Sequence, residues 1–263
     1  GFFGASASDV DLFTVTVGRK PSSASAYLEE YKDVVELLKS GIPDAKDYAL
    51  WSLSLSIDEA STKTICTEGG IRPLVNLLSA SNIRVKEQAA SALSLLAATN
   101  GETQIAIAKE GGIAPLIALL DVDMGSEETQ VRAAAALSNL ALKADNKEAI
   151  MAAGGIAPLV ALLSDGDTEA KQCAAAALAR LSFNDEWTQN AIGEAGAIAP
   201  LVNLLGGDRG EAAQEEAAGA LYALAERCER VLVRAIAGGD LAHERLAKLE
   251  ELRINEGTRL RFT

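Results

Sequence analysis

The sequence of 263 residues has few of the residue types on which metal sites, proton relays and disulfide-bonded folds rely. It contains 1 histidine, 3 cysteines and only 4% aromatic residues. The histidine, His243, has no second histidine with which to build a metal cluster or a relay. Cys66, Cys173 and Cys228 lie far apart in the sequence. We therefore expect buried structural thiols and a reducing compartment rather than a disulfide framework.

The sequence also lacks an excess of basic residues and a long apolar run. Its 24 Lys and Arg stand against 37 Asp and Glu, a formal net charge of −13. This charge disfavours nucleic acid as a partner and favours a basic or neutral protein. No apolar run reaches the roughly 18 residues of a membrane-spanning helix, so we expect no direct membrane insertion. The cytoplasm is the favoured location; because the chain begins with glycine, an organelle reached after removal of a targeting segment is the alternative.

Recognisable catalytic motifs are absent as well. No Gly-Lys-Ser or Gly-Lys-Thr follows the Gly-Gly pairs, so these pairs are turns and not phosphate loops. Ser94 and Ser138 have no base in view and do not sit in a strand-to-helix elbow. Acidic stretches such as SEET, residues 126–129, lack the spacing of a calcium loop. The sequence therefore predicts no enzyme activity, no cofactor, no metal and no small-molecule substrate.

A ten-residue segment recurs through the chain. It reads GGIRPLVNLL from Gly69, GGIAPLIALL from Gly111, GGIAPLVALL from Gly154 and GAIAPLVNLL from Gly196. The prolines of these copies follow one another at steps of 42, 43 and 42 residues. A fixed period of this length is typical of repeat proteins, in which one supersecondary unit is stacked on the next.

One period, residues 101–144, predicts three helices. TQIAIAKE forms a short helix that the following Gly-Gly ends, because glycine enters the left-handed conformation without steric cost. Pro115 suits the first turn of a second helix, where its missing N–H needs no partner. A polar loop follows, and QVRAAAALSNLALKA forms the third helix.

The third helix carries a second recurrent motif, ALxxL. Its five copies are ALWSL, ALSLL, ALSNL, ALARL and ALYAL, at steps of 43, 44, 41 and 43 residues. The alanine and the two leucines fall on one helical face, whereas the two middle positions vary. We predict that the constant positions form the core and that the variable positions are exposed.

The combination of a short helix, Gly-Gly, Ile-x-Pro-Leu-Val-x-Leu-Leu and an Ala-rich helix with ALSNLA resembles the armadillo repeat. The resemblance covers about residues 26–240. It implies an all-α fold, a right-handed α-solenoid with about four full repeats and partial capping repeats. It also implies that the third helices line a concave groove, which holds extended peptides or partner proteins.

The repeat period suggests the following domain boundaries. Residues 1–25 are an extended N-terminal arm or linker, 26–255 are the repeat array and 256–263 are a C-terminal tail. The array divides into an N-terminal partial repeat, four full repeats and a C-terminal cap, at residues 26–58, 59–100, 101–144, 145–185, 186–228 and 229–255. The capping segments have lost parts of the motif, as terminal repeats commonly do.

The variable positions of the third helices predict the residues of a protein-binding groove. They include aromatic and arginine side chains, which are frequent interface anchors. The predicted groove residues are Tyr48, Trp51, Arg132, Asn139, Lys143, Arg180 and Tyr222. Importin-alpha-like arrays carry a Trp four residues before an Asn, but here Ala135 precedes Asn139, so that cargo site is not matched. The long basic run of beta-catenin-like arrays is missing too.

Three functions are compatible with these features. The first is a non-enzymatic scaffold or adaptor, alone or as a subunit of a larger complex, that binds a partner segment in the groove. The second is the substrate-recognition array of a larger enzyme such as a ubiquitin ligase. The third, a solenoid that holds a cofactor for transfer, is remote because histidine, cysteine and carboxylate residues are not clustered. Outside the groove, we expect Trp187 to pack between repeats.

Overall fold

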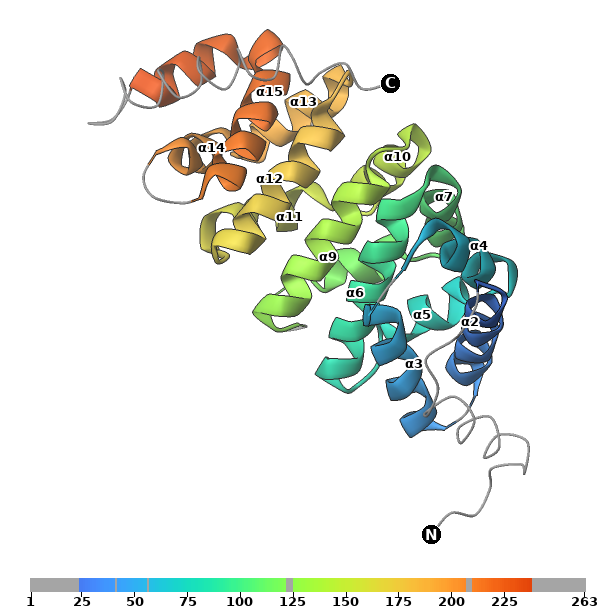
Figure 1. Ribbon diagram of the computed structural model, residues 1–263. Coiled ribbons are helices and arrows are strands. Elements are labelled where there is room, and N and C mark those ends of the chain that lie inside the picture. Colours follow the sequence, from blue (N-terminus) through green and yellow to red (C-terminus); the bar gives the residue numbers. More distant parts are fainter. Residues whose placement is uncertain (1–23, 41, 56, 122–124, 207–209, 238–263) are drawn as a thin grey trace. The chain divides into compact units, whose positions relative to one another are not determined.

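The computed structural model describes residues 24–40, 42–55, 57–121, 125–206 and 210–237. Every secondary-structure element in these ranges is an α-helix, which confirms the predicted all-α fold (Figure 1). Residues 1–23 of the predicted arm, the tail at 256–263 and His243 lie outside the described residues. The chain divides into two units, residues 1–115 and 116–263, and each is described by itself.

Unit 1 contains a helix pair followed by helices of a complete repeat. The pair, α2 and α3, occupies the segment predicted as the N-terminal partial repeat, and α6 packs against both α3 and α5. The helices that begin in this unit are α2 (Ala24–Lys39), α3 (Pro43–Leu55), α4 (Glu59–Thr67), α5 (Ile71–Leu77), α6 (Ile83–Thr99), α7 (Gly101–Lys109) and α8 (Ile113–Ala118).

In unit 2 the long third helices of successive repeats pack side by side. Helix α12 contacts α9 on one side and α15 on the other (Figure 1). The helices of this unit are α9 (Glu127–Leu140), α10 (Ala144–Ala152), α11 (Ile156–Asp165), α12 (Thr168–Ser182), α13 (Glu186–Glu194), α14 (Ile198–Leu205) and α15 (Glu211–Ala237). Helix α15 runs through the position between residues 228 and 229, where the repeat period predicts the start of the C-terminal cap.

The repeated motif forms the core, as predicted. The alanine and both leucines of all five ALxxL copies are at most 1% exposed. Each first helix adds one isoleucine that is completely buried, at Ile65, Ile107, Ile150 and Ile192. Aliphatic side chains of this size contribute about 1.5 to 3 kcal/mol each when fully buried. The repeat is therefore held together mainly by its constant positions.

Buried amide side chains cap the ends of the third helices. The Nε2 atoms of Gln104 and Gln189 donate to the backbone oxygens of Ala97 and Ser182, at 2.9 and 3.0 Å. In the repeat between them, Asn146 performs the same task and donates to the Leu140 oxygen at 3.1 Å. The last carbonyls of a helix have no partner within the helix. These amides therefore satisfy them where water has little access.

The two glycines of the Gly-Gly turn serve different purposes. Gly154 has a φ of 76°, a left-handed conformation that side chains with a Cβ rarely adopt. Gly155 has an ordinary φ of −68°, but a Cβ there would lie 2.7 Å from Ile150 Cγ2. The fourth copy has Ala197 at this position, and its N–H to Ile192 oxygen distance is 3.3 Å, against 2.9 Å for Gly155 and Ile150. A methyl group is therefore accommodated only where the turn opens slightly.

Substitutions at these two glycines should separate backbone strain from crowding. At Gly154, alanine is expected to cost about 1 kcal/mol of unfolding free energy, and asparagine less, because asparagine tolerates the left-handed region. At Gly155, alanine is expected to cost about 1–3 kcal/mol by overpacking, and the larger asparagine more. Urea unfolding of the four variants measures this. The same order of alanine and asparagine at both positions would contradict the two separate roles.

Two leucines of the α9 region test the assignment of the core face. Leu137 is completely buried, whereas Leu142, just beyond the helix, is 55% exposed. Leu137→Ala is expected to lower the unfolding free energy by about 2–5 kcal/mol. The identical change at Leu142 is expected to stay within about 0.5 kcal/mol. Thermal or urea unfolding compares the two, and equal losses would show that the faces are assigned wrongly.

Candidate functional site

Polar side chains link the neighbouring third helices of unit 2. We call this surface, formed by the outward side chains of α9, α12 and α15, the third-helix face. Polar contacts and electrostatic interactions connect residues of neighbouring helices along it. Three of the predicted groove residues, Arg132, Asn139 and Arg180, lie on α9 and α12 and belong to this face.

Arg180 joins two successive third helices. Its Nη1 atom, on α12, donates to Ser138 Oγ at 2.6 Å and to Asn139 Oδ1 at 3.0 Å, both on α9. Ser138 is only 2% exposed, although its position in the motif predicts exposure. The reason is that a guanidinium from 42 residues further along the chain lies over it. Arg180 and Asn139 thus lie together, as predicted, but they already bind each other.

The charge of Arg180 also influences Glu216 on α15. Burial raises the pKa of the Glu216 carboxyl, the nearby negative charge of Glu215 acts in the same direction, and the positive charge of Arg180 opposes both. The hydrogen-bond partners that hold the Arg180 guanidinium itself are neutral oxygens. The Arg180 guanidinium is therefore held in position by two neutral hydrogen-bond acceptors, while its charge interacts with the Glu216 carboxyl.

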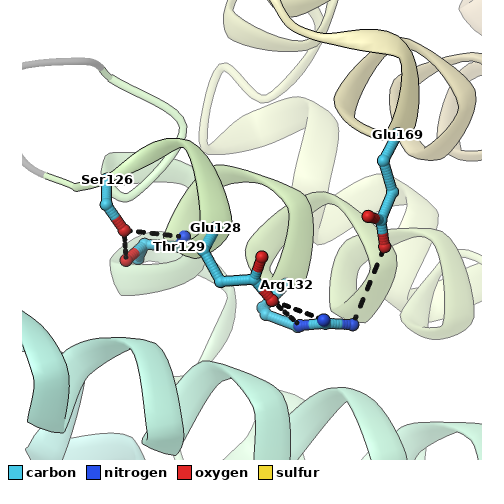
Figure 2. Close-up of polar contacts among 5 residues, drawn as sticks. All are labelled: Ser126, Glu128, Thr129, Arg132 and Glu169. Atoms are coloured by element: carbon cyan, nitrogen blue, oxygen red, sulfur yellow. Dashed lines mark hydrogen bonds and ion pairs between the residues drawn. The ribbon is translucent and has the colours of Figure 1, made fainter.

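Arg132 is in a different state, because carboxylates lie on both sides of it (Figure 2). Its Nε donates to Glu128 Oε1 at 2.7 Å, and its Nη2 also pairs with that oxygen. Its Nη1 lies 3.9 Å from Glu169 Oε1 on α12. Exposed ion pairs of this kind contribute little to stability. They do, however, occupy the guanidinium, so that Arg132 is less available to a partner than Arg180.

The start of α9 is fixed independently of this ion pair. Ser126 is the N-cap, and its Oγ accepts a hydrogen bond from the Thr129 N–H at 3.2 Å (Figure 2). Side-chain oxygens at this position satisfy backbone donors that have no partner in the first turn. Glu127 and Glu128 follow in that turn, where negative charge interacts favourably with the helix dipole. Glu128 thus stands at a rigid helix start when it binds Arg132.

Cys173 lies between these charged groups on α12 and is half-buried. Burial raises the pKa of its thiol to about 11; the charge of Glu169 adds to this effect and that of Arg132 opposes it. Burial likewise raises the pKa of the Cys66 thiol. Since the thiolate is the reactive form, both cysteines are protonated and unreactive near neutral pH. The predicted burial of these two side chains is only partial, and the Cys228 side chain lies outside the described residues.

The remaining predicted groove residues are placed differently. Tyr222 lies on α15 and is 46% exposed. Lys143 is not on a third helix, because α9 ends at Leu140 and Lys143 is the N-cap residue of α10. Tyr48 and Trp51 belong to α3 of unit 1, with ring centroids 5.8 Å apart and Trp51 50% exposed. Among the predicted groove residues of unit 2, the structure brings Asn139 and Arg180 into contact, and Tyr48 and Trp51 form a pair within unit 1.

Glu169 and Glu216 are residues of the third-helix face that the sequence prediction missed. A usable signal for Glu216 was its register: Arg132, Cys173 and Glu216 each precede the first leucine of ALxxL by five residues. Side chains at one register of successive third helices lie in one row. Trp187 was placed wrongly, because it is 68% exposed and does not pack between repeats.

Among the side chains that the structure describes, no group of three or more His, Cys, Asp or Glu residues is arranged to hold a metal ion. In the same ranges, no helix alone has the length and apolar composition needed to cross a membrane. Helices α10 and α11 meet this criterion only when counted together, and they are bent by 81°.

Comparison with known families and structures gives a consistent result. The model of the Armadillo/beta-catenin-like repeat matches residues 58–98, 102–142, 143–183 and 189–225. No match was found among the curated proteins. Computationally designed armadillo repeat proteins for modular peptide recognition are similar in structure, with a TM-score of 0.73 and 27% identity, over 84% of this chain and 99% of the other.

Two other solved structures are similar to the same degree. A designed armadillo repeat protein in complex with the peptide (KR)4 has a TM-score of 0.73 and 26% identity, over 85% of this chain and 99% of the other. An engineered protein has a TM-score of 0.73 and 30% identity, over 85% of this chain and 96% of the other.

The Arg180 contact should be measurable as a coupling energy between α9 and α12. In a double-mutant cycle, Arg180→Ala and Ser138→Ala are expected to be coupled by about 0.5–1.5 kcal/mol, because each removes the same hydrogen bond. Lys171→Ala on the same helix is the control and should be additive with Ser138→Ala. Urea unfolding of the single and double variants gives both values. Additive effects of Arg180 and Ser138 would show that the contact carries no energy.

Proposed function

Because the chain belongs to the Armadillo/beta-catenin-like repeat family, we propose that it is a non-enzymatic scaffold that binds a segment of a partner protein on the third-helix face of unit 2. The armadillo fold supports protein binding in general. The finer assignment, to this face and to Arg180 as its main contact, rests on the geometry of unit 2.

The observation that carries the proposal is the state of the Arg180 guanidinium. Two hydrogen bonds from one nitrogen fix its orientation, and both acceptors are neutral. A side chain that is already ordered loses little conformational entropy when it binds, so more of the contact energy appears as affinity. The remaining N–H groups of a guanidinium bind a carboxylate or backbone carbonyls in a fixed geometry. Arg180 is therefore a preorganised contact for an extended chain.

The surroundings of Arg180 favour a protein segment of mixed character. Glu128 and Glu169 supply negative charge on the same face, and Tyr222 supplies an exposed aromatic ring on α15. Such a face matches a segment with both polar and aromatic contacts better than a uniformly charged polymer. The net charge of −13 supports protein over nucleic acid as the partner class. No cofactor and no small-molecule substrate enters this proposal.

The structural relatives support peptide binding as the mode. One group was designed for modular peptide recognition, and one relative is in complex with the peptide (KR)4. A repeat array presents one row of side chains per repeat, and an extended peptide presents side chains at a similarly regular spacing. We propose the same mode here, with Asn139 and Arg180 as neighbouring contacts.

The experiment has two steps: identification of the partner by pull-down from native extract with mass spectrometry, and measurement of its affinity for variants. Arg180→Ala combined with Asn139→Ala is expected to weaken the main partner at least about tenfold, or ~1.4 kcal/mol. Arg180→Lys keeps the charge but loses the planar fork, and should give an intermediate loss.

Lys171→Ala is the matched control on the same helix and should bind like the parent protein. All variants are compared at a temperature at which circular dichroism shows them folded, since Arg180 also links two helices. If the double variant binds the identified partner as tightly as the parent does, the third-helix face is not the binding site.

A further inference from the structure

Three large apolar side chains of unit 2 are exposed to an extent that the fold does not explain. Trp187, Leu142 and Phe183 are 68%, 55% and 52% exposed. They are the most exposed large apolar side chains in the part of the chain that the structure describes. Isolated exposed apolar residues are common, but a group of them at one place marks an interaction surface.

All three lie at the turns between a third helix and the first helix that follows it. Leu142 lies between α9 and α10, Phe183 ends α12, and Trp187 is in the first turn of α13. The two turns are neighbours, because Lys147 of α10 contacts Phe183. Figure 1 shows α10 and α13 on the same side of α9 and α12. We call this surface, defined by Leu142, Phe183 and Trp187, the turn edge.

The repeat does not need large side chains at these positions. Leu142 and Phe183 each lie five residues after the first leucine of ALxxL, where the copy at Leu93 has Ala98. Trp187 lies two residues after the N-cap Asp185, where two other repeats have Ala60 and Glu102 after their N-caps. Alanine and glutamate at equivalent positions show that the fold forms without this apolar bulk.

The turn edge is held in a defined conformation. Lys147 Nζ donates to the Phe183 backbone oxygen at 2.8 Å and lies 5.9 Å from the centroid of its ring. A cation at the end of α12 also interacts favourably with the helix dipole. Asp185 Oδ1 accepts from the Trp187 N–H at 3.1 Å, and Asn184 takes a left-handed φ of 55° in the tight turn. The exposed rings therefore project from an ordered turn.

The charges beside these rings are mainly negative. Asp145, Glu148 and Glu186 are exposed in the first turns of α10 and α13 or close to them. Two lysines lie among them: Lys143 follows Leu142 at the start of α10, and Lys147 is directed at the Phe183 carbonyl and ring. An apolar surface with an acidic border is complementary to an apolar segment with basic flanks.

We propose that the turn edge is a second docking surface, separate from the third-helix face, for a partner segment that presents apolar side chains flanked by Lys or Arg. A second copy of this chain fits less well, because it would bring two acidic borders together. With a net charge of −13, the whole chains repel as well. This inference does not depend on the function proposed for the third-helix face.

Selection from a random-peptide phage library on the full chain tests this proposal, with counter-selection against Leu142→Ser/Trp187→Ser. That variant keeps Phe183 and its contact with Lys147, and it changes only exposed side chains, so it is expected to fold. The enriched peptides should combine Leu, Phe or Trp with Lys or Arg. By fluorescence anisotropy, each should bind the variant at least about tenfold more weakly than the parent.

Two control variants distinguish binding at the turn edge from binding elsewhere on the chain. Asp145→Asn/Glu148→Gln/Glu186→Gln should weaken the same peptides several-fold, with a smaller dependence on salt. Arg180→Ala/Asn139→Ala should leave the affinity of these peptides unchanged, whether or not it weakens binding at the third-helix face. The proposal is overturned if no peptide binds the parent more tightly than Leu142→Ser/Trp187→Ser, or if the enriched peptides lack basic residues. It is also overturned if the parent protein is a dimer and Leu142→Ser/Trp187→Ser is a monomer.

Discussion

The packing of an isoleucine against the glycine that starts the next helix is the contact on which the repeats with a Gly-Gly turn depend. A Cβ on Gly155 would lie 2.7 Å from Ile150 Cγ2 and 3.1 Å from Ile117 Cδ1. Ile150 belongs to the first helix of the same repeat and Ile117 to the second helix of the preceding one. One absent side chain therefore sets both the turn between α10 and α11 and the approach of neighbouring repeats. Because α12 packs on α11, the position of the third-helix face follows from it.

A backbone fixed in this way leaves the outward side chains free to differ between repeats. At the register two residues after the first leucine of ALxxL, α9 has Asn139, α12 has Arg180 and α15 has Ala223. The fold places these positions in neighbouring helices but does not select their chemistry. Arg180 donates hydrogen bonds to Ser138 and Asn139 of α9, and the nitrogen that makes these bonds is not available to a partner. The charge of the Arg180 guanidinium remains available to a partner, because its two hydrogen-bond acceptors are neutral. This arrangement requires two neighbouring repeats, since the arginine and its acceptors come from different ones.

The sequence predicts the core well because the positions of the core residues follow from local periodicity. The i, i+1 and i+4 positions of ALxxL lie on one face of any helix, and all of them are buried. Prediction from the sequence fails where contacts between repeats decide whether a side chain is buried. Ser138 is buried by an arginine from the next repeat, which no local pattern reveals. Lys143 was placed on a helix that ends at Leu140, because Ala141 and Leu142 suit a helix as well as a turn. Trp187 was expected to pack between repeats, but in the first turn of α13 it is 68% exposed.

The two proposed surfaces of unit 2 differ in physical basis, and this difference decides how they would act together. Contacts to Arg180 and its neighbouring carboxylates are polar and weaken with salt, whereas burial of Leu142 and Trp187 depends mainly on apolar area and does not. Each surface by itself is small, and small interfaces bind weakly. A partner with two segments would gain from the second contact through effective concentration, without any new contact at either surface. Weak single contacts are therefore no argument against tight binding of a longer partner, and ionic strength would mainly change the contribution of the third-helix face.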